Sequence, residues 1–261
     1  MNNNQIKALQ NKFNKYIKSL ETTDAEIQWN LQMKIVHTSR VQANIIEICR
    51  SLNLSPEQTN LAEASALLHD IGRFEQYLKY GTFKDTDSID HATLGIKVIS
   101  EQNILQEVAS EEAELILTAI NYHNKKDLPL DVTDEELFYC KLIRDADKLD
   151  IFDLVVNYYE TRDVGNKRSL ELSLPDNGKV SDKVYDALYR GKIVNIADVQ
   201  NLNDFKLLQI GWIFDINFAY AREKILEHNY IERIFQQINC DRDLSKLRGH
   251  FNELATTHRF A

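Results

Sequence analysis

Apolar side chains recur at helical spacing along most of the chain, whereas the alternation that marks a strand is scarce. Between about residues 25 and 51, steps of three and four residues place one stripe on a single side of a helix, and this stripe contains Met33, His37, Val41, Ile45 and Ile48. The chain has only 8 glycines and 3 prolines, too few for a sandwich or barrel of many short strands. We therefore predict an all-α fold.

Capping signals predict where the next helix begins. The segment Ser-Pro-Glu-Gln at 55–58 supplies an N-cap, a proline at the first helical position and a capping-box partner. This helix should reach His69 and Asp70, and Gly72 is expected to end or bend it. The mixed polar run at 74–90 indicates a loop or a broken helix.

Three more helices should carry histidine and acidic side chains. One begins near residues 90–91, and another runs from Ser110 to about His123. A third follows the capping box at 133–136 and carries Asp147. These assignments place the candidate ligands of the first half of the chain on separate helices.

The organisation changes after about residue 150. Residues 162–182 hold two glycines and a proline among polar residues, which indicates a long loop. Residues 204–238 are typical of one or two amphipathic helices rich in aromatic side chains. We predict a first domain at residues 1–154 and a helical C-terminal extension at residues 155–261 that packs on it.

The charge of the chain bears on its partners. The formal net charge is -9, so no overall positive field is available to hold nucleic acid through counterion release. A polymeric nucleic-acid partner is therefore disfavoured. A small anion can still bind, because a bound divalent ion with a few basic side chains reverses the sign of the local charge.

The cysteines and the lack of long apolar runs indicate in which cellular compartment the protein is expected. Cys49, Cys140 and Cys240 lie far apart without a CxxC pair, so neither a disulfide framework nor a thiolate zinc site is indicated. They are typical of core thiols in a reducing compartment. The polar start of the sequence lacks the apolar stretch of a signal peptide, and no run of 18 apolar residues occurs. We expect a cytoplasmic protein without a membrane partner.

Four of the seven histidines fall in the first half of the chain, and one is followed directly by an aspartate. They are His37, His69, His91 and His123, with Asp70 next to the second. A single histidine on an apolar helix face is more often a core residue than a ligand, but the complete series is harder to explain in that way. Neutral imidazoles with carboxylates suit manganese, iron, cobalt, nickel or zinc, and helical bundles build such sites from facing helices.

Five segments resemble the motifs of the HD-domain superfamily of metal-dependent phosphohydrolases: HTSRV at 37–41, HDIGR at 69–73, DHATLG at 90–95, NYHN at 121–124 and RDADKLD at 144–150. The resemblance spans roughly residues 30–151 and implies an HD-type helical bundle. In that superfamily the first histidine, the HD pair and a final aspartate bind a metal. Carried over to this sequence, it implies that the core ligands are His37, His69, Asp70 and Asp147.

The remaining two histidines leave the number of ions open. His91 and His123 resemble the extra histidines of the binuclear members, in which the aspartate of the HD pair bridges two ions. In mononuclear relatives with a similar pattern, such histidines bind substrate phosphate instead. No GYP-type motif follows HDIG, and no synthetase or nucleotidyltransferase domain is present, so the cyclic-dinucleotide, stringent-response and tRNA-repair branches are disfavoured.

The expected chemistry is attack by a metal-activated water. A divalent ion lowers the pKa of bound water and stabilises charge on phosphoryl oxygens, so Asp70, which should contact every ion, is central to catalysis. Arg73 lies an i, i+4 step beyond His69 and can fork onto phosphate as a catalytic and substrate-binding residue. Lys148 is a weaker substrate-binding candidate, because it is adjacent to Asp147 and neighbouring helix residues do not share a face.

The resemblance therefore implies a phosphomonoesterase or phosphodiesterase that acts on a small phosphorylated substrate such as a nucleotide. Two alternatives stay open. The superfamily also includes mixed-valent di-iron oxygenases with a similar ligand set, which would consume oxygen in an iron-dependent manner. The second alternative is a non-catalytic, metal-stabilised protein that binds a ligand or has a regulatory role. The complete ligand set argues against it. The oligomeric state is left open by the sequence.

Overall fold

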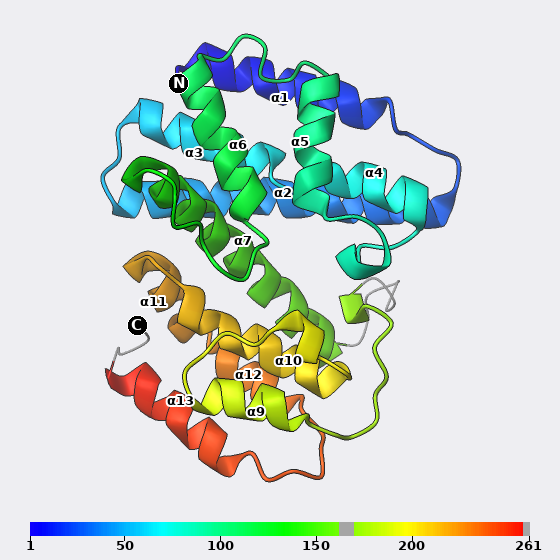
Figure 1. Cartoon of the computed structure of the whole chain (residues 1–261), viewed down its shortest axis with the longest axis vertical. Helices are drawn as coiled ribbons and strands as arrows, with labels where there is room; N and C mark the ends of the chain where they lie inside the picture. The colour runs from blue at the N-terminus through cyan, green and yellow to red at the C-terminus, as the bar shows by residue number, and fades with distance from the viewer. Residues whose placement is uncertain (162–169, 258–261) are drawn as a thin grey trace. The chain divides into compact units, whose positions relative to one another are not determined.

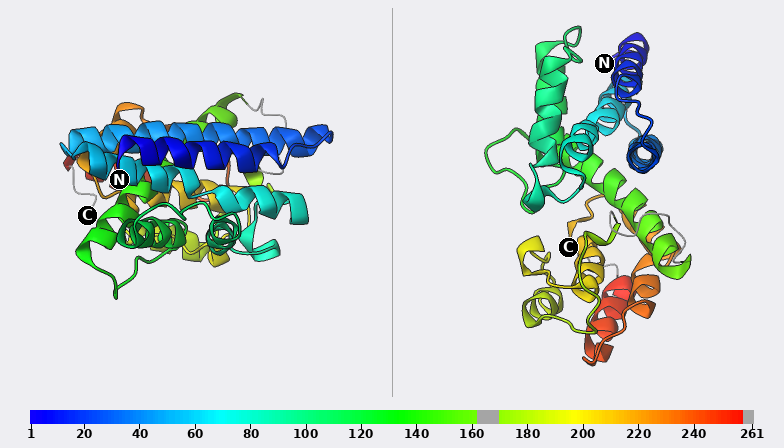
Figure 2. Two further views of the ribbon diagram at one scale, coloured as in Figure 1. Left: turned by 90° about the horizontal axis from the view of Figure 1, so that it is seen from above. Right: turned by 90° about the vertical axis from the view of Figure 1, so that its right-hand side faces the viewer.

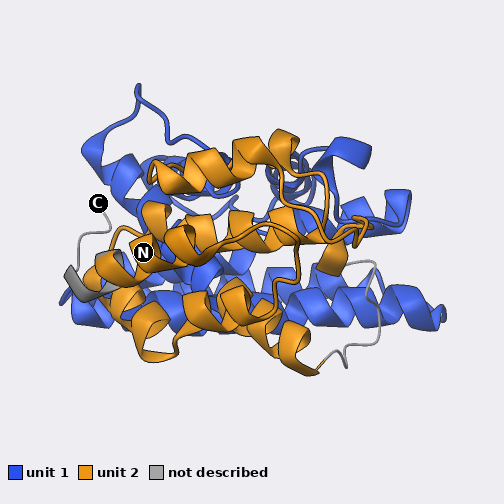
Figure 3. Ribbon diagram, turned by 90° about the horizontal axis from the view of Figure 1, so that it is seen from below, with its two compact units in different colours: residues 1–150 blue, residues 151–261 orange. Residues whose placement is uncertain are grey.

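The computed structural model describes residues 1–161 and 170–257, and within them it contains helices but no strand. The predicted all-α class is therefore confirmed. The chain divides into two compact units, Met1–Asp150 and Ile151–Ala261 (Figure 3). Our predicted boundary lies four residues later, and the packing of the C-terminal extension on the first domain stays a prediction. No described helix is both long and apolar enough to cross a membrane.

Unit 1 is a bundle of helices, seen from three directions in Figures 1 and 2. Its elements are α1 (Asn3–Lys18), α2 (Ala25–Ser51), α3 (Pro56–Leu68), α4 (Ile71–Tyr80), the 3-10 turn η1 (Asp85–Asp87), α5 (His91–Glu101), α6 (Ser110–Tyr122) and the first part of α7 (Asp134–Thr161). α2 packs against α3 and α4, α4 packs against α5, and α6 packs against both α3 and α5. α1, which the sequence analysis did not predict, covers α3.

The predicted helix starts are confirmed. Ser55 and Gln58 form the capping box of α3, each side chain bonding the backbone of the other. Asp90 caps α5 by accepting a hydrogen bond from the backbone of Thr93. The capping box at 133–136 is also present at the start of α7. These side chains satisfy amide groups that the first turn of a helix leaves without partners.

Gly72 does not end a helix, so that prediction was wrong. The chain bends two residues earlier, at Asp70, whose backbone has φ -104° and ψ 13°. α3 therefore stops before Asp70, and Gly72 lies inside α4. α4 also takes up the first part of the predicted loop at 74–90, because the buried Phe74 and Tyr77 give it an apolar face.

Gly72 is needed for the close approach of α4 and α5. A Cβ at this position would lie 2.5 Å from the amide nitrogen of Gly95 and closer still to the carbonyl oxygen of His91. Because both are backbone atoms, α5 would have to shift. We expect Gly72→Ala to lower the free energy of unfolding by about 1–3 kcal/mol, the usual effect of overpacking, as measured by urea denaturation.

Gly249 provides the matched control for this substitution. It lies in α13 (Ser245–Thr257), and a Cβ there would meet no described atom within 4 Å. Gly249→Ala should leave stability unchanged or raise it by up to about 1 kcal/mol, because alanine favours a helix over glycine. A Gly72→Ala protein as stable as the wild type would contradict the packing of α4 on α5.

Unit 2 is also helical. Besides α13 it contains α9 (Asp182–Tyr189), the 3-10 turn η2 (Ile196–Asp198), α10 (Leu202–Gly211), the 3-10 turn η3 (Trp212–Asp215), α11 (Ala219–Glu227) and α12 (Tyr230–Gln236). The one or two helices predicted over 204–238 are thus three, because η3 separates α10 from α11 and Asn229, with φ 55°, separates α11 from α12. Of the loop predicted at 162–182, residues 162–169 lie outside the described residues, and residues 172–181 are non-helical.

Candidate metal centre

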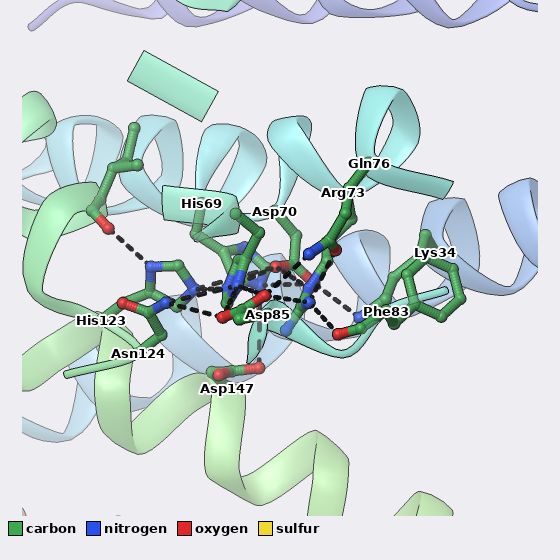
Figure 4. Close-up of polar contacts among 12 residues, drawn as sticks. Lys34, His69, Asp70, Arg73, Gln76, Phe83, Asp85, His123, Asn124 and Asp147 are labelled. Atoms are coloured by element: carbon green, nitrogen blue, oxygen red, sulfur yellow. Dashed lines mark hydrogen bonds and ion pairs between the residues drawn. The ribbon is translucent and has the colours of Figure 1, made fainter. Parts of the chain in front are cut away.

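Four buried histidines of unit 1 gather around Asp70, and each comes from a different helix or helix end. Figure 4 labels two of them, His69 and His123, beside Asp70. His37 lies on the buried side of α2, where the apolar stripe places it. His69 and His123 follow the last residues of α3 and α6, while His91 is the first residue of α5. The helix ends and the bend at Asp70 therefore direct these side chains to one place.

Two of the rings are fixed by the carbonyl groups of their own helices. The Nδ1 atom of His69 donates to the carbonyl oxygen of Ala66 at 2.8 Å, and that of His123 donates to Ile120 at 2.6 Å. A carbonyl oxygen can only accept, so the proton of each neutral ring is on Nδ1. The Nε2 atom then carries a lone pair, which is the form that binds a metal.

The other two rings are fixed by carboxylates. The Nδ1 atom of His37 lies 2.6 Å from Oδ2 of Asp150, and that of His91 lies 2.7 Å from Oδ2 of Asp85. Such a partner favours the proton on Nδ1 and leaves Nε2 as the ligand atom. All four Nε2 atoms can therefore act as metal ligands, and they lie close together.

The Nε2 atoms meet in two pairs that share Asp70. They are 3.3 Å apart between His37 and His69, and 2.9 Å apart between His91 and His123. Oδ2 of Asp70 lies 3.4 and 3.6 Å from the two Nε2 atoms of the first pair, and Oδ1 lies 3.4 and 3.8 Å from those of the second. Lone pairs this close repel one another unless a proton or a cation lies between them.

Asp147 adds a carboxylate to the first pair. Its Oδ1 lies 3.2 Å from Nε2 of His37 and 3.7 Å from Nε2 of His69, and this buried atom accepts no hydrogen bond from any described residue. An unsatisfied buried acceptor destabilises the folded protein by about 1–3 kcal/mol. A cation bound to this oxygen would remove that destabilisation. Three overlapping sets have donor atoms within 4.8 Å of one another: His37–His69–Asp70, His69–His123–Asp147 and Asp70–His91–His123.

The charges of the cluster also suit a cation. Burial lowers the pKa of His69 to about 4, and burial with the nearby Arg73 lowers the pKa of His91 to about 4. Burial and Lys34 act to lower the pKa of His37 as well, but three carboxylates outweigh them and raise it to about 10, namely Asp147, Asp150 and Asp70. The negative charge around His37 therefore stabilises a positive charge at Nε2, which a proton or a metal ion can supply.

Comparison with known protein families gives a match over residues 35–151, to the family described as HD domain. This part of the chain is an HD domain. The predicted resemblance is thereby confirmed, and HD domains are typically metal-dependent phosphohydrolases. The comparisons with curated proteins and with solved structures gave no match.

Arg73 of the HD domain lies beside Asp70 but is also tied to the loop after α4. Its Nε lies 3.5 Å from Oδ1 of Asp70 and, although buried, makes no hydrogen bond with any described residue. Its Nη1 donates to the side chains of Gln76 and Asp85 and to the carbonyl oxygen of Phe83 (Figure 4). The guanidinium is thus anchored on one side, and its role toward substrate stays a prediction.

Lys148 follows Asp147 in α7 of the HD domain and is only 8% exposed. Its Nζ lies 3.5 Å from the carbonyl oxygen of Arg144, one helical turn earlier. Arg144 in turn donates to the carbonyl oxygens of Tyr122 and His123, and so holds the end of α6 against α7. The predicted contact between Lys148 and substrate stays a prediction.

Three polar residues of unit 1 that contact the cluster were not predicted from the sequence: Lys34, Asp85 and Asp150. Lys34 places Nζ 2.7 Å from Oδ2 of Asp70, and its position three residues before His37 on the same helix face could have revealed it. Asp150 could have been found in the same way, because it lies three residues after Asp147. Asp85 lies in a loop, where no periodic signal marks it.

Proposed function

We propose that the HD domain is a divalent-metal-dependent phosphohydrolase that cleaves a phosphoester of a small molecule such as a nucleotide. The observation that carries this proposal is the position of Asp70, which presents one oxygen to each pair of histidines. The mixture of imidazoles and carboxylates favours manganese, iron, cobalt, nickel or zinc. A divalent ion in such a site supplies a nucleophilic water near neutral pH and stabilises charge on phosphoryl oxygens.

We assign two ion positions to the cluster. The pair His37 and His69, with Asp70 and Asp147, would hold one ion, and the second pair with the other oxygen of Asp70 would hold another. The 2.9 Å contact between two Nε2 atoms of the second pair supports the second position, because both lone pairs would otherwise lack a partner. Asp70 then serves both positions through its two oxygens.

Two cationic side chains flank Asp70 and are suited to receive a phosphate group. Lys34 lies against Oδ2 and Arg73 against Oδ1, and each side chain is 16% exposed. Charge on a metal ion would compete with Lys34 for Asp70, so the ammonium group would become available to substrate. The guanidinium of Arg73 can offer two parallel N–H groups to phosphate oxygens, whereas Lys148 lies deeper and is assigned a secondary role.

The substitution Arg73→Ala tests the substrate contact. We expect kcat/KM for phosphoesters to fall by roughly 10²–10³-fold, the effect of removing one donor to transition-state charge, while the ion at the first histidine pair stays bound. Arg73→Lys is the comparison, because it keeps the charge and loses the fork; it should recover part of the activity. Normal kcat/KM per bound metal in Arg73→Ala would show that the arginine is only structural.

The proposed activity is tested by phosphate release from nucleoside phosphates, sugar phosphates and diesters, with each of the five metals in turn. The net charge of -9 disfavours polymeric nucleic acids as substrates. Dissolved oxygen is followed in the same samples. Phosphate release with at least one metal supports the proposal, whereas iron-dependent oxygen consumption without phosphate release would identify an oxygenase. Bound metal with neither activity would identify a ligand-binding protein.

A further inference from the structure

Asp85 is a further carboxylate at the second histidine pair, and it belongs to no motif of the sequence. It lies at the start of η1, in the loop between α4 and α5. Four donors converge on this one carboxylate, at distances of 2.7–3.4 Å: Nδ1 of His91, Nη1 of Arg73, Nε2 of Gln76 and Nδ2 of Asn124. All four are N–H groups, so the carboxylate of Asp85 is the acceptor in each of these contacts.

The rings of the two histidine pairs are held in the same way. His69 and His123 are each held by a carbonyl oxygen of their own helix. The other ring of each pair is held by a carboxylate from a different element. Asp150 supports His37 in the first pair, and Asp85 supports His91 in the second. A ring held by its own helix keeps its orientation as long as the helix exists, but a carboxylate-held ring depends on a separate element.

The two supporting carboxylates differ in how firmly they are placed. Asp150 lies within α7, and its side chain is 2% exposed. Asp85 lies in a loop, and its side chain is 30% exposed. The loop is fastened mainly by Gln76, which is fully buried and whose amide also donates to Ser88 Oγ and to the carbonyl oxygen of Ile89.

We propose that Asp85 is the positioning residue of the second ion site, where it fixes the orientation and proton position of His91, and that Arg73 and Gln76 hold it there. This inference rests on the proposed function, because it assumes an ion at the second pair. Removal of such a support usually weakens metal binding about 10–100-fold. The loop at 81–90 thereby governs the occupancy of one ion site and leaves the other unaffected.

The test compares Asp85→Ala with Asp87→Ala. Asp87 lies in the same turn and carries the same charge, but it is exposed, is paired with Lys84 and does not contact the cluster. Metal content is measured in the full chain, and the affinity of each ion is measured by competition with a chelating dye. We expect Asp85→Ala to bind the second ion about 10–100-fold more weakly, with the first ion unchanged, and Asp87→Ala to match the wild type.

A second measurement does not depend on metal. In metal-free protein, ¹⁵N nuclear magnetic resonance of the His91 ring should show the proton on Nδ1 in the wild type and in Asp87→Ala, and a mixture of tautomers in Asp85→Ala. Asp85→Asn keeps one acceptor oxygen, so it should retain more of the second ion than Asp85→Ala does. It also serves if the alanine variant fails to fold.

The outcomes separate the two claims. An Asp85→Ala protein that binds both ions with wild-type affinity and keeps the proton of His91 on Nδ1 would overturn the role of Asp85 and leave the proposed function standing. A wild-type protein that binds no second ion would overturn the two-ion assignment, and the role of Asp85 at that site with it.

Discussion

Asp70→Ala is expected to abolish metal-dependent phosphate release while leaving the helical fold largely intact. Each oxygen of Asp70 faces one histidine pair, so its removal takes a ligand from both ion positions at once. The loss should therefore exceed the roughly 10–100-fold effect of removing a residue that only supports a ligand. Turnover at saturating metal measures the loss, and circular dichroism checks the helical content.

The same substitution at Asp87 is the control, because that carboxylate is exposed and lies outside the cluster. Asp87→Ala should keep the turnover of the wild type. Near-native turnover of Asp70→Ala at saturating metal would mean that the cluster is not the site of hydrolysis. A variant that unfolds would instead assign Asp70 a structural role, through its ion pair with Lys34.

The double substitution His91→Ala/His123→Ala should lower the metal content from about two ions to about one per chain. These imidazoles are buried, and their Nε2 atoms face each other at 2.9 Å. Without a second ion, two buried acceptors would remain unsatisfied at a cost of about 1–3 kcal/mol each. Elemental analysis of protein purified without chelator measures the stoichiometry.

A control with two other histidines is available in the same chain. His228 and His250 lie in unit 2, the first directly after α11 and the second in α13, and their replacement by alanine should leave the metal content unchanged. An unchanged stoichiometry in His91→Ala/His123→Ala, with weaker substrate binding, would contradict the two-ion assignment. Those histidines would then contact substrate phosphate in a mononuclear enzyme.

The residues of the cluster were predictable where they follow a helix. His37 falls on the apolar stripe of α2, and the inward direction of that stripe follows from the period of the helix. His91 lies at a helix start that the N-cap residue Asp90 marks, and His123 lies at the end of the helix predicted from Ser110. Local pattern thus predicted both the all-α fold and the separate helices that supply these side chains.

The loop contacts and the backbone packing were not predictable in this way. The support of His91 by Asp85 depends on the path of residues 81–90, which have no periodic pattern. The role of Gly72 depends on α5 lying against α4, a contact between segments that are separate in sequence. The bend at Asp70 carries no glycine or proline of its own, so no residue type marked it in the sequence.

Phosphate release by chelator-treated protein, measured before and after each metal is added back, decides whether the cluster is a hydrolytic metal centre. We expect no release without metal, and release that rises with the metal bound until the cluster is full. Asp70→Ala should stay inactive at every metal concentration. Equal phosphate release in the chelator-treated and the metal-loaded protein would contradict the claim that this histidine and aspartate cluster is a hydrolytic metal centre.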